Sequence, residues 1–349
     1  MRRLAAFGLV CLGLVPSAAA ATDASWAQPQ IKLVVEAGLL AERVADFKPQ
    51  KSLTQKTLAG ALETLSRSSD EPVDYRYPAA APGRAVTIRE LDAALVGFLG
   101  LGDSARSVTA ALRGAGLAPK PGAGTETIAR LLGFRFNHPA ADDALELGLN
   151  DAATRAEAAY SLARLLGLSG WEQDWVRSQT EELVLPELSD VQRQILNRAV
   201  SFVGYPYVWG GTSETPQQPF GKPTPGGFDC SGFIWRVFKL EPFPGASALA
   251  AVLRGRTTYQ MSGEVAPAQR IRKAENLQPG DLIFQATVAS SRNPPRSATP
   301  GSISAAAGSC TRPEAAPPSI RSKGGTATGS PGLGVPCGKQ GSAPNWRDP

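Results

Sequence analysis

Apolar residues recur at helical spacing in three segments of the first half of the chain, and a threonine opens each pattern. The segments are residues 53–65, 86–99 and 153–166. A leucine stands at the same distance after Thr54, Thr87 and Thr154. Threonine is a favoured N-cap, and this spacing is typical of an amphipathic helix. The repetition therefore predicts capped helical repeats over residues 22–170.

A different pattern covers residues 191–284, where a helix precedes a strand-like stretch, a Pro/Gly/Gln loop, a second helix and a strand. Residues 171–190 are interpreted as a linker. Periodicity ends at Phe284, and residues 285–349 are rich in glycine, proline, serine and alanine. Such composition predicts disorder. The expected fold class is α+β: an all-α helical bundle, a truncated α+β domain and a disordered tail.

Two stretches of the first part, residues 26–65 and 149–168, resemble S-layer homology (SLH) repeats, the second through its "TRAE" sequence. The resemblance implies helix pairs in a three-fold bundle. It also implies binding of cell-wall polysaccharide by the arginine of that signature, Arg155. The other copies read "TQKT" and "TIRE" at this place. Two alternatives stay open: the repeats serve only as a scaffold, or amphipathic helices look alike in an alanine-rich chain.

Residues 1–21 have the features of a secretory signal peptide. Arg2 and Arg3 precede an apolar run over residues 4–15, and small residues follow. The run is shorter than the roughly 20 residues that a membrane-spanning helix needs. The sequence therefore predicts that the signal peptide is cleaved, that the protein is exported to the cell wall, and that it has no transmembrane segment. Loss of Cys11 would leave an odd number of cysteines, which argues against a disulfide framework.

Cys230 is the cysteine best placed for chemistry. Asp229 is a natural N-cap, and apolar residues at helical spacing follow, so Cys230 is predicted at the first position of a helix. The positive end of the helix dipole and the free N–H groups there favour a thiolate and can donate to an oxyanion. The alternative is a buried, inert cysteine.

The motifs around this cysteine resemble those of the NlpC/p60 family of papain-like cell-wall cysteine peptidases. They read "GYPYVWGG", "GGFDCSGFIWRVF" and "LQPGDLIF", within residues 191–284. The resemblance implies that Cys230 attacks a stem-peptide bond of peptidoglycan, commonly the γ-D-glutamyl–diamino acid bond. It also implies an active-site role for Tyr207 and substrate binding beside the cysteine by Asp229, Ser231 and Gly232.

The family pattern breaks after Phe284, where the resemblance implies a strand bearing a general-base histidine. The chain has one histidine, His138, in a loop-like stretch more typical of a surface residue. When the codons are read one nucleotide early, Thr299–Thr311 permit "HTGIYLGGGWFMH", which contains two histidines. We therefore hypothesise a frameshift near Phe284–Gln285. The alternative is a natural low-complexity tail on a degenerate domain.

These observations predict an exported peptidoglycan hydrolase that is inactive as written because the catalytic histidine is missing. The alternatives are a non-catalytic wall-binding protein acting through the SLH-like part, and a decayed gene. The net charge of +5 lies in residues 285–349 and therefore indicates no nucleic-acid partner. No phosphate loop or metal cluster stands out in the sequence, and no cofactor or metal is expected.

Overall fold

The computed structural model describes residues 25–69, 73–135, 146–239, 251–286, 303–306 and 343–344. The predicted signal peptide and His138 lie outside these residues, as do Cys11, Cys310 and Cys337. What the sequence predicts for them stays a prediction. Among the described residues, no helix is long and apolar enough to cross a membrane.

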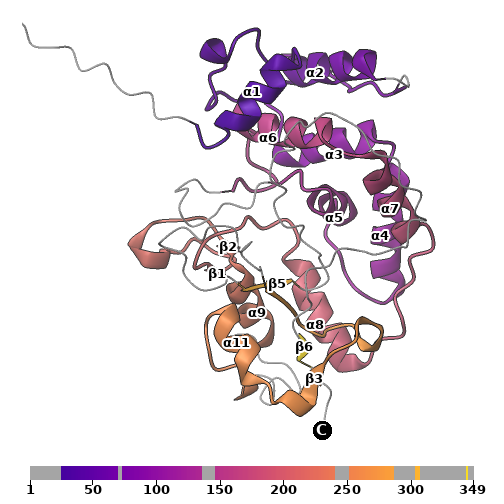
Figure 1. The fold of residues 1–349 in the computed structure, drawn as a ribbon, viewed down its shortest axis with the longest axis vertical. Helices are drawn as coiled ribbons and strands as arrows, with labels where there is room; N and C mark the ends of the chain where they lie inside the picture. Colours follow the sequence, from indigo (N-terminus) through magenta and orange to yellow (C-terminus); the bar gives the residue numbers. More distant parts are fainter. Residues whose placement is uncertain are drawn as a thin grey trace, which may run out of the picture.

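Helices build the first part of the chain, which occupies the upper half of Figure 1. They are α1 (Gln28–Glu36), the short 3-10 turn η1 (Val44–Asp46), α2 (Gln55–Ser68), α3 (Ile88–Phe98), α4 (Gly102–Gly114), α5 (Ala123–Leu131), α6 (Arg155–Leu166) and α7 (Gly170–Glu181). Helix α1 packs against α6, and α5 packs against both α3 and α4. We call this part the helical bundle.

The three predicted capped helices are confirmed as α2, α3 and α6. Thr54, Thr87 and Thr154 are their N-caps, and each hydroxyl accepts a hydrogen bond from a backbone N–H in the first turn. Thr87 also forms a capping box, because the Glu90 carboxylate accepts from the Thr87 N–H at 2.8 Å. The threonine signal in the sequence therefore located the start of all three helices.

The residues just before these caps are joined in a closed ring of backbone hydrogen bonds. The Leu53 N–H donates to the Ala153 carbonyl, the Ala153 N–H to Val86, and the Val86 N–H to Leu53, each at 2.8 Å. All three side chains are fully buried in the bundle core. The three capped helices thus start from one centre, although the SLH-like character of the bundle stays a prediction.

The second part mixes helices with short strands, in the lower half of Figure 1. Its elements are α8 (Asp190–Ser201), β1 (Thr212–Ser213), η2 (Pro219–Gly221), β2 (Gly227–Phe228), α9 (Cys230–Phe238), α11 (Thr258–Glu264), η3 (Pro267–Gln269), β3 (Arg270–Ile271), η4 (Ala274–Asn276) and β4 (Ile283–Ala286). Strands β1 and β2 pair in antiparallel fashion. Helices with a small sheet agree with the expected α+β class. We call this part the small domain.

Helix α7 occupies most of the stretch that the sequence suggested was a linker. Its start is held by the Glu172 carboxylate, which accepts from the Ser169 N–H at 3.0 Å and the Ser169 hydroxyl at 2.7 Å. Val176 and Thr180 on one face are buried, and α7 packs against α4. The helix was missed because only part of one face is apolar, so the periodic signal is weak.

Two short strands from residues 285–349 pair with the small domain. Strand β5 (Ile303–Ala306) runs antiparallel to β4, and β6 (Ala343–Pro344) runs antiparallel to β3. Backbone groups make these ladders, so a composition poor in strand-forming side chains does not prevent them. The disorder predicted for residues 285–349 stays a prediction.

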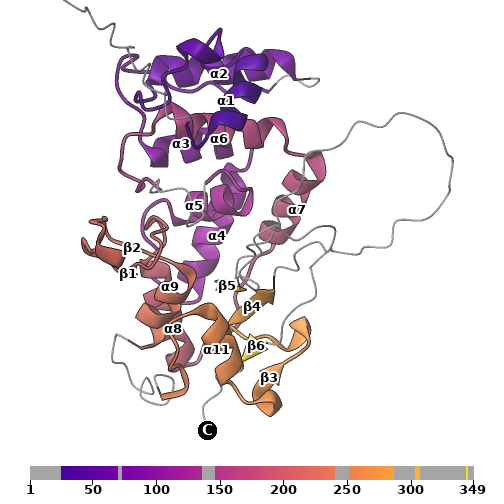
Figure 2. The same ribbon diagram turned by 60° about the vertical axis from the view of Figure 1, so that its left-hand side comes forward.

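Helix α8 connects the two parts of the chain. In Figure 2, α8 and α9 lie below α4 and α5. The Ala118 N–H donates to the Asn197 side-chain oxygen at 2.9 Å, and the Arg193 guanidinium donates to the Ala115 carbonyl at 2.8 Å. Leu117 of the bundle joins a small buried cluster with Leu188 and Val200. Polar and apolar contacts together therefore connect the small domain to the bundle.

Candidate active site

Cys230 is the first residue of α9, as the sequence predicts. The Asp229 carboxylate caps this helix by accepting from the Gly232 N–H at 2.5 Å. The opposite face of α9 is buried in the core of the small domain through Ile234, Val237 and related residues. The core thus fixes the helix axis, while the cap orients the first turn, which holds a half-buried thiol.

A short extended segment lies beside the start of α9. The Val208 N–H donates to the Phe228 carbonyl at 3.1 Å, and the Phe228 N–H donates to the Pro206 carbonyl at 3.3 Å. Tyr207 stands between these two bonds and forms a parallel bridge with Phe228. Because Phe228 is two residues before Cys230, this pairing sets the position of Tyr207 relative to the cysteine.

The Tyr207 phenol shares its surroundings with the cysteine and the cap. Burial raises the pKa of Tyr207 above its ordinary value, and negative charge on Cys230 and Asp229 raises it further. The phenol therefore stays protonated near neutral pH and can donate a hydrogen bond. The structure brings together the five residues that the sequence assigns to the site: Cys230, Tyr207, Asp229, Ser231 and Gly232.

Arg256 belongs to this group and was missed in the sequence. Its guanidinium donates to the Asp229 carboxylate at 3.2 Å and to the Ser231 hydroxyl at 2.5 Å. It also donates to the carbonyls of Gly210 and Gly211 at 3.2 and 3.4 Å. The arginine therefore neutralises Asp229 and joins it to the loop after Tyr207. The sequence around Arg256 shows a capping box at Thr257 that starts α11, but it contains no signal for the distant residues that Arg256 binds.

Glycines let the backbone segments approach closely at this place. A side chain at Gly232 would collide with the Gly211 carbonyl, so Gly232 packs the first turn of α9 against that loop. The Gly210 N–H donates to the Asp229 carboxylate at 2.9 Å, and Gly210 has a φ of 75° that favours glycine. The structure thus gives Gly232 a packing role beside the substrate-binding role that the family resemblance implies.

A second missed residue, Glu146, reaches the site from the segment that leads into α6. Its fully buried carboxylate accepts from the Tyr207 N–H at 2.7 Å. Arg130 and Arg135 donate to the same carboxylate at 2.7 and 2.8 Å. Burial alone would raise the pKa of Glu146, but the two guanidinium groups lower it below its ordinary value. Glu146 is therefore a charged acceptor for the active-site segment.

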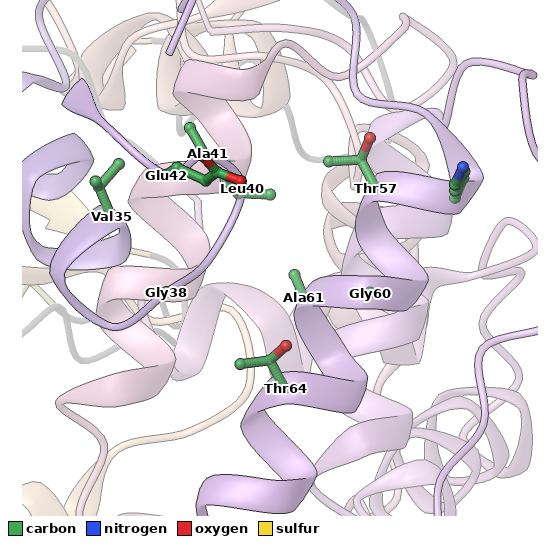
Figure 3. Close-up of a pocket in the computed structure, with 10 residues that line it drawn as sticks. Val35, Gly38, Leu40, Ala41, Glu42, Thr57, Gly60, Ala61 and Thr64 are labelled. Carbon is green, nitrogen blue, oxygen red and sulfur yellow. The ribbon is translucent and has the colours of Figure 1, made fainter. Parts of the chain in front are cut away.

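Arg155 lies apart from this group, at the start of α6 in the bundle (Figure 1). Its guanidinium donates to the Leu40 carbonyl and lies over the Phe47 ring, 4.9 Å from the ring centroid. Leu40 in turn lines an open cavity of about 450 Å³ between the loop after α1 and helix α2. Figure 3 shows Thr57, Ala61 and Thr64 of α2 on one side of this cavity.

The described residues contain no cluster of histidine, cysteine, aspartate and glutamate that could hold a metal ion. Near the cysteine, the structure places a thiol at a helix start, a protonated phenol and an arginine-bound carboxylate. These groups can attack a carbonyl carbon and donate hydrogen bonds to an oxyanion.

Comparison with known proteins decides the family of this region. Residues 204–294 match the model of the NlpC/P60 family. The chain contains an NlpC/P60 domain. Within this domain, the matched residues start just before Tyr207 and include the start of α9 with Cys230, so the resemblance read from the motifs is confirmed at this level.

One curated relative matches part of the chain. It is the gamma-D-glutamyl-L-lysine dipeptidyl-peptidase of Bacillus subtilis (strain 168), which is 26% identical over 106 residues. The match covers 30% of this chain and 28% of the relative, so the chain spans under a third of that protein. No solved structure matches the chain. The family match therefore places the similarity at residues 204–294, and the match to the relative covers less than a third of either chain.

Proposed function

We propose that the protein is an exported peptidoglycan hydrolase of the NlpC/P60 type. Cys230 is its nucleophile, and the bond cleaved is the γ-D-glutamyl–diamino acid bond of the stem peptide. The position of Cys230 at the capped start of α9, beside Tyr207, carries this proposal. In this mechanism a base takes the Cys230 proton, and the thiolate adds to the scissile carbonyl. The base returns the proton to the amine, which leaves to give an acyl-enzyme, and water then releases the acyl group.

The choice of substrate rests on the relative and on the site. The relative's name specifies a gamma-D-glutamyl-L-lysine bond, which is the kind of linkage found in peptidoglycan stems. A thiolate needs an electrophilic carbonyl, and the N–H groups at the start of α9 can hold the oxyanion that forms. Export follows from the predicted signal peptide, which places the enzyme where its substrate lies.

We further propose that the chain as written has little or no hydrolase activity. A papain-like mechanism needs a base to take the cysteine proton, and the sequence has one histidine, His138, far from the motifs. In our frameshift hypothesis, the displaced reading frame restores two histidines after Phe284. Cys230 would then receive its base from the strand that follows β4.

The test compares two full-length proteins on purified peptidoglycan, the chain as written and a version whose frame is restored after Phe284. We expect stem-peptide release by the restored protein alone, and complete loss of release in its Cys230→Ala variant. Mass spectrometry of the products identifies the bond. No release by a folded restored protein would overturn the hydrolase proposal, and equal release by the chain as written would overturn the proposed inactivity.

A second candidate is a non-catalytic wall-binding protein that acts through the helical bundle. The closed ring of three capped helices favours it, because three-fold helix bundles are what the SLH resemblance implies. The binding residue would be Arg155, which the structure ties to Leu40 and Phe47. Sedimentation with purified walls separates the candidates: retention that is lost in Arg155→Ala but kept in Cys230→Ala, together with no stem cleavage, supports the binder.

A further inference from the structure

A hydrogen bond between the two parts of the chain ends at the active-site segment. Val208 and Pro206 use their N–H and carbonyl groups to pair with Phe228. The Tyr207 N–H, which lies between them, points to the opposite edge of this strand and donates to Glu146 at 2.7 Å. An unpaired edge N–H buried against another domain is costly. Glu146 therefore supplies the acceptor that the small sheet itself does not offer.

Glu146 is itself held rigidly. Arg130 donates to its carboxylate and also to the carboxylate of Glu126, at 2.7 and 2.6 Å, while Arg135 donates to the same Oε1 of Glu146. Arg130 reaches the Tyr205 carbonyl at 3.5 Å as well. A buried carboxylate bound by two arginines has one favoured position, because moving it would leave buried charges unpaired. The bundle thus presents a fixed acceptor.

Only a few residues connect the Tyr207–Glu146 hydrogen bond to Cys230. Tyr207 bridges Phe228, and Phe228 is followed by the cap Asp229 and by Cys230. A shift of the segment at Tyr207 therefore moves the start of α9 or breaks its pairing with the segment. Misplacement of about 1 Å at a reacting group is enough to slow a reaction substantially.

We propose that Glu146 is a positioning residue for the active site, through which the helical bundle sets Tyr207 and Cys230. The helical bundle then helps to position the active-site residues, and this role is independent of any ligand that the bundle itself binds. The inference rests on the proposed function only in treating Cys230 as the nucleophile. The test of the Glu146 proposal uses no cell-wall substrate. Its result can therefore be interpreted even if the protein proves not to be a hydrolase.

The test replaces Glu146 in the full chain and measures two properties of the site. Glu146→Gln removes the charge with little change in shape, and Glu146→Asp keeps the charge but shortens its reach. In both variants we expect the Tyr207 phenol, titrated by ultraviolet difference spectra against Tyr207→Phe, to ionise at a lower pH than in the unchanged protein as the ring gains solvent. We also expect alkylation of Cys230 by iodoacetamide to slow about threefold or more as the first turn of α9 loses its fixed orientation.

Glu172→Gln is the matched control, because Glu172 also binds an arginine and a backbone N–H. Its partners, Arg164 at 2.7 Å and Ser169 at 3.0 Å, both belong to the bundle. We expect Glu172→Gln to lower stability while leaving the Tyr207 titration and the Cys230 alkylation rate unchanged. Peptide mapping assigns the alkylated residue, since the chain has four cysteines.

Two results would overturn the proposal. One is a folded Glu146→Gln protein with an unchanged Tyr207 titration and an unchanged Cys230 rate. The other is an equal change in Glu172→Gln, which would mean that general loosening of the bundle is responsible. If Glu146→Gln does not fold, Arg130→Lys replaces it. That change keeps a cation beside Glu146 but loses the fork that also binds Glu126, and the same two readouts decide.

Discussion

The helical bundle and the small domain both start helices with a polar cap, yet the caps differ in what they hold. In the bundle, Thr54 and Thr87 bond to the first turn of their own helices. In the small domain, Asp229 caps α9 and also binds Arg256 and the Gly210 N–H. A threonine cap is therefore a local device, whereas Asp229 joins three segments of the chain at the cysteine.

The two parts also differ in how completely they bury their side chains. The bundle encloses a core whose central residues have no exposed area, and it also buries charged groups. The small domain keeps Cys230 half-buried and exposes aromatic residues nearby, among them Trp209 at 52%. A closed core tolerates few unpaired charges, so the largest electrostatic effects on stability are expected in the bundle, and smaller ones at the site.

The largest effect is expected from Glu157, which is buried at the start of α6. Burial raises its pKa from 4.5 to about 7; the Glu146 charge adds to this, and Arg135 opposes it. The folded bundle therefore keeps a proton that the unfolded chain releases above pH 4.5. This contribution is fully present below pH 4.5 and is lost as pH rises to about 7, a loss of about 3 kcal/mol.

Urea unfolding of the protein and of Glu157→Gln between pH 4 and about pH 8 measures this effect. Relative to the variant, whose glutamine does not titrate, the unchanged protein should lose stability across that window and level off above it. The same substitution at the exposed Glu63, Glu63→Gln, serves as a control for the loss of a carboxylate on the bundle surface. Parallel profiles for Glu157→Gln and the unchanged protein would contradict the expectation.

A smaller effect is expected at the cap of the small domain. Asp229→Ala removes the cap of α9 and leaves Arg256 and Ser231 without their shared acceptor, at a cost of about 2 kcal/mol in the free energy of unfolding. Asp229→Asn keeps an acceptor for the Gly232 N–H and should cost about half as much. Chemical denaturation followed by near-ultraviolet circular dichroism measures both. If Asp229→Ala costs no more than a threonine cap, the contrast between the two regions fails.

The smallest effect is expected at a cap of the bundle. Thr87→Ala removes one local acceptor and one half of a capping box, which should cost about 1 kcal/mol. Thr87→Ser keeps the hydroxyl and should cost little. Far-ultraviolet circular dichroism during urea unfolding measures the difference. An equal loss in both variants would show that the methyl group, and not the capping hydrogen bond, stabilises α3.

Local signals predicted much of the fold and part of the site. The three threonine caps, the start of α9 at Cys230 and the motifs around Tyr207 all involve residues within a few positions of one another. Glu146 and Arg256 were missed because their partners are distant: 61 residues separate Glu146 from Tyr207, and 27 separate Asp229 from Arg256. Helix α7 was missed because its periodicity is weak.

The sequence by itself determined where α2, α3, α6 and α9 begin, that α2, α3 and α6 have an apolar face, and that a thiol stands at the start of α9. These properties depend on hydrogen bonds and side-chain spacing within about one helical turn. Only the tertiary structure decided that a carboxylate of the bundle accepts from the active-site segment, and that an arginine neutralises Asp229. Such pairs form when packing brings distant residues together and removes water, so their partners are set by the whole fold.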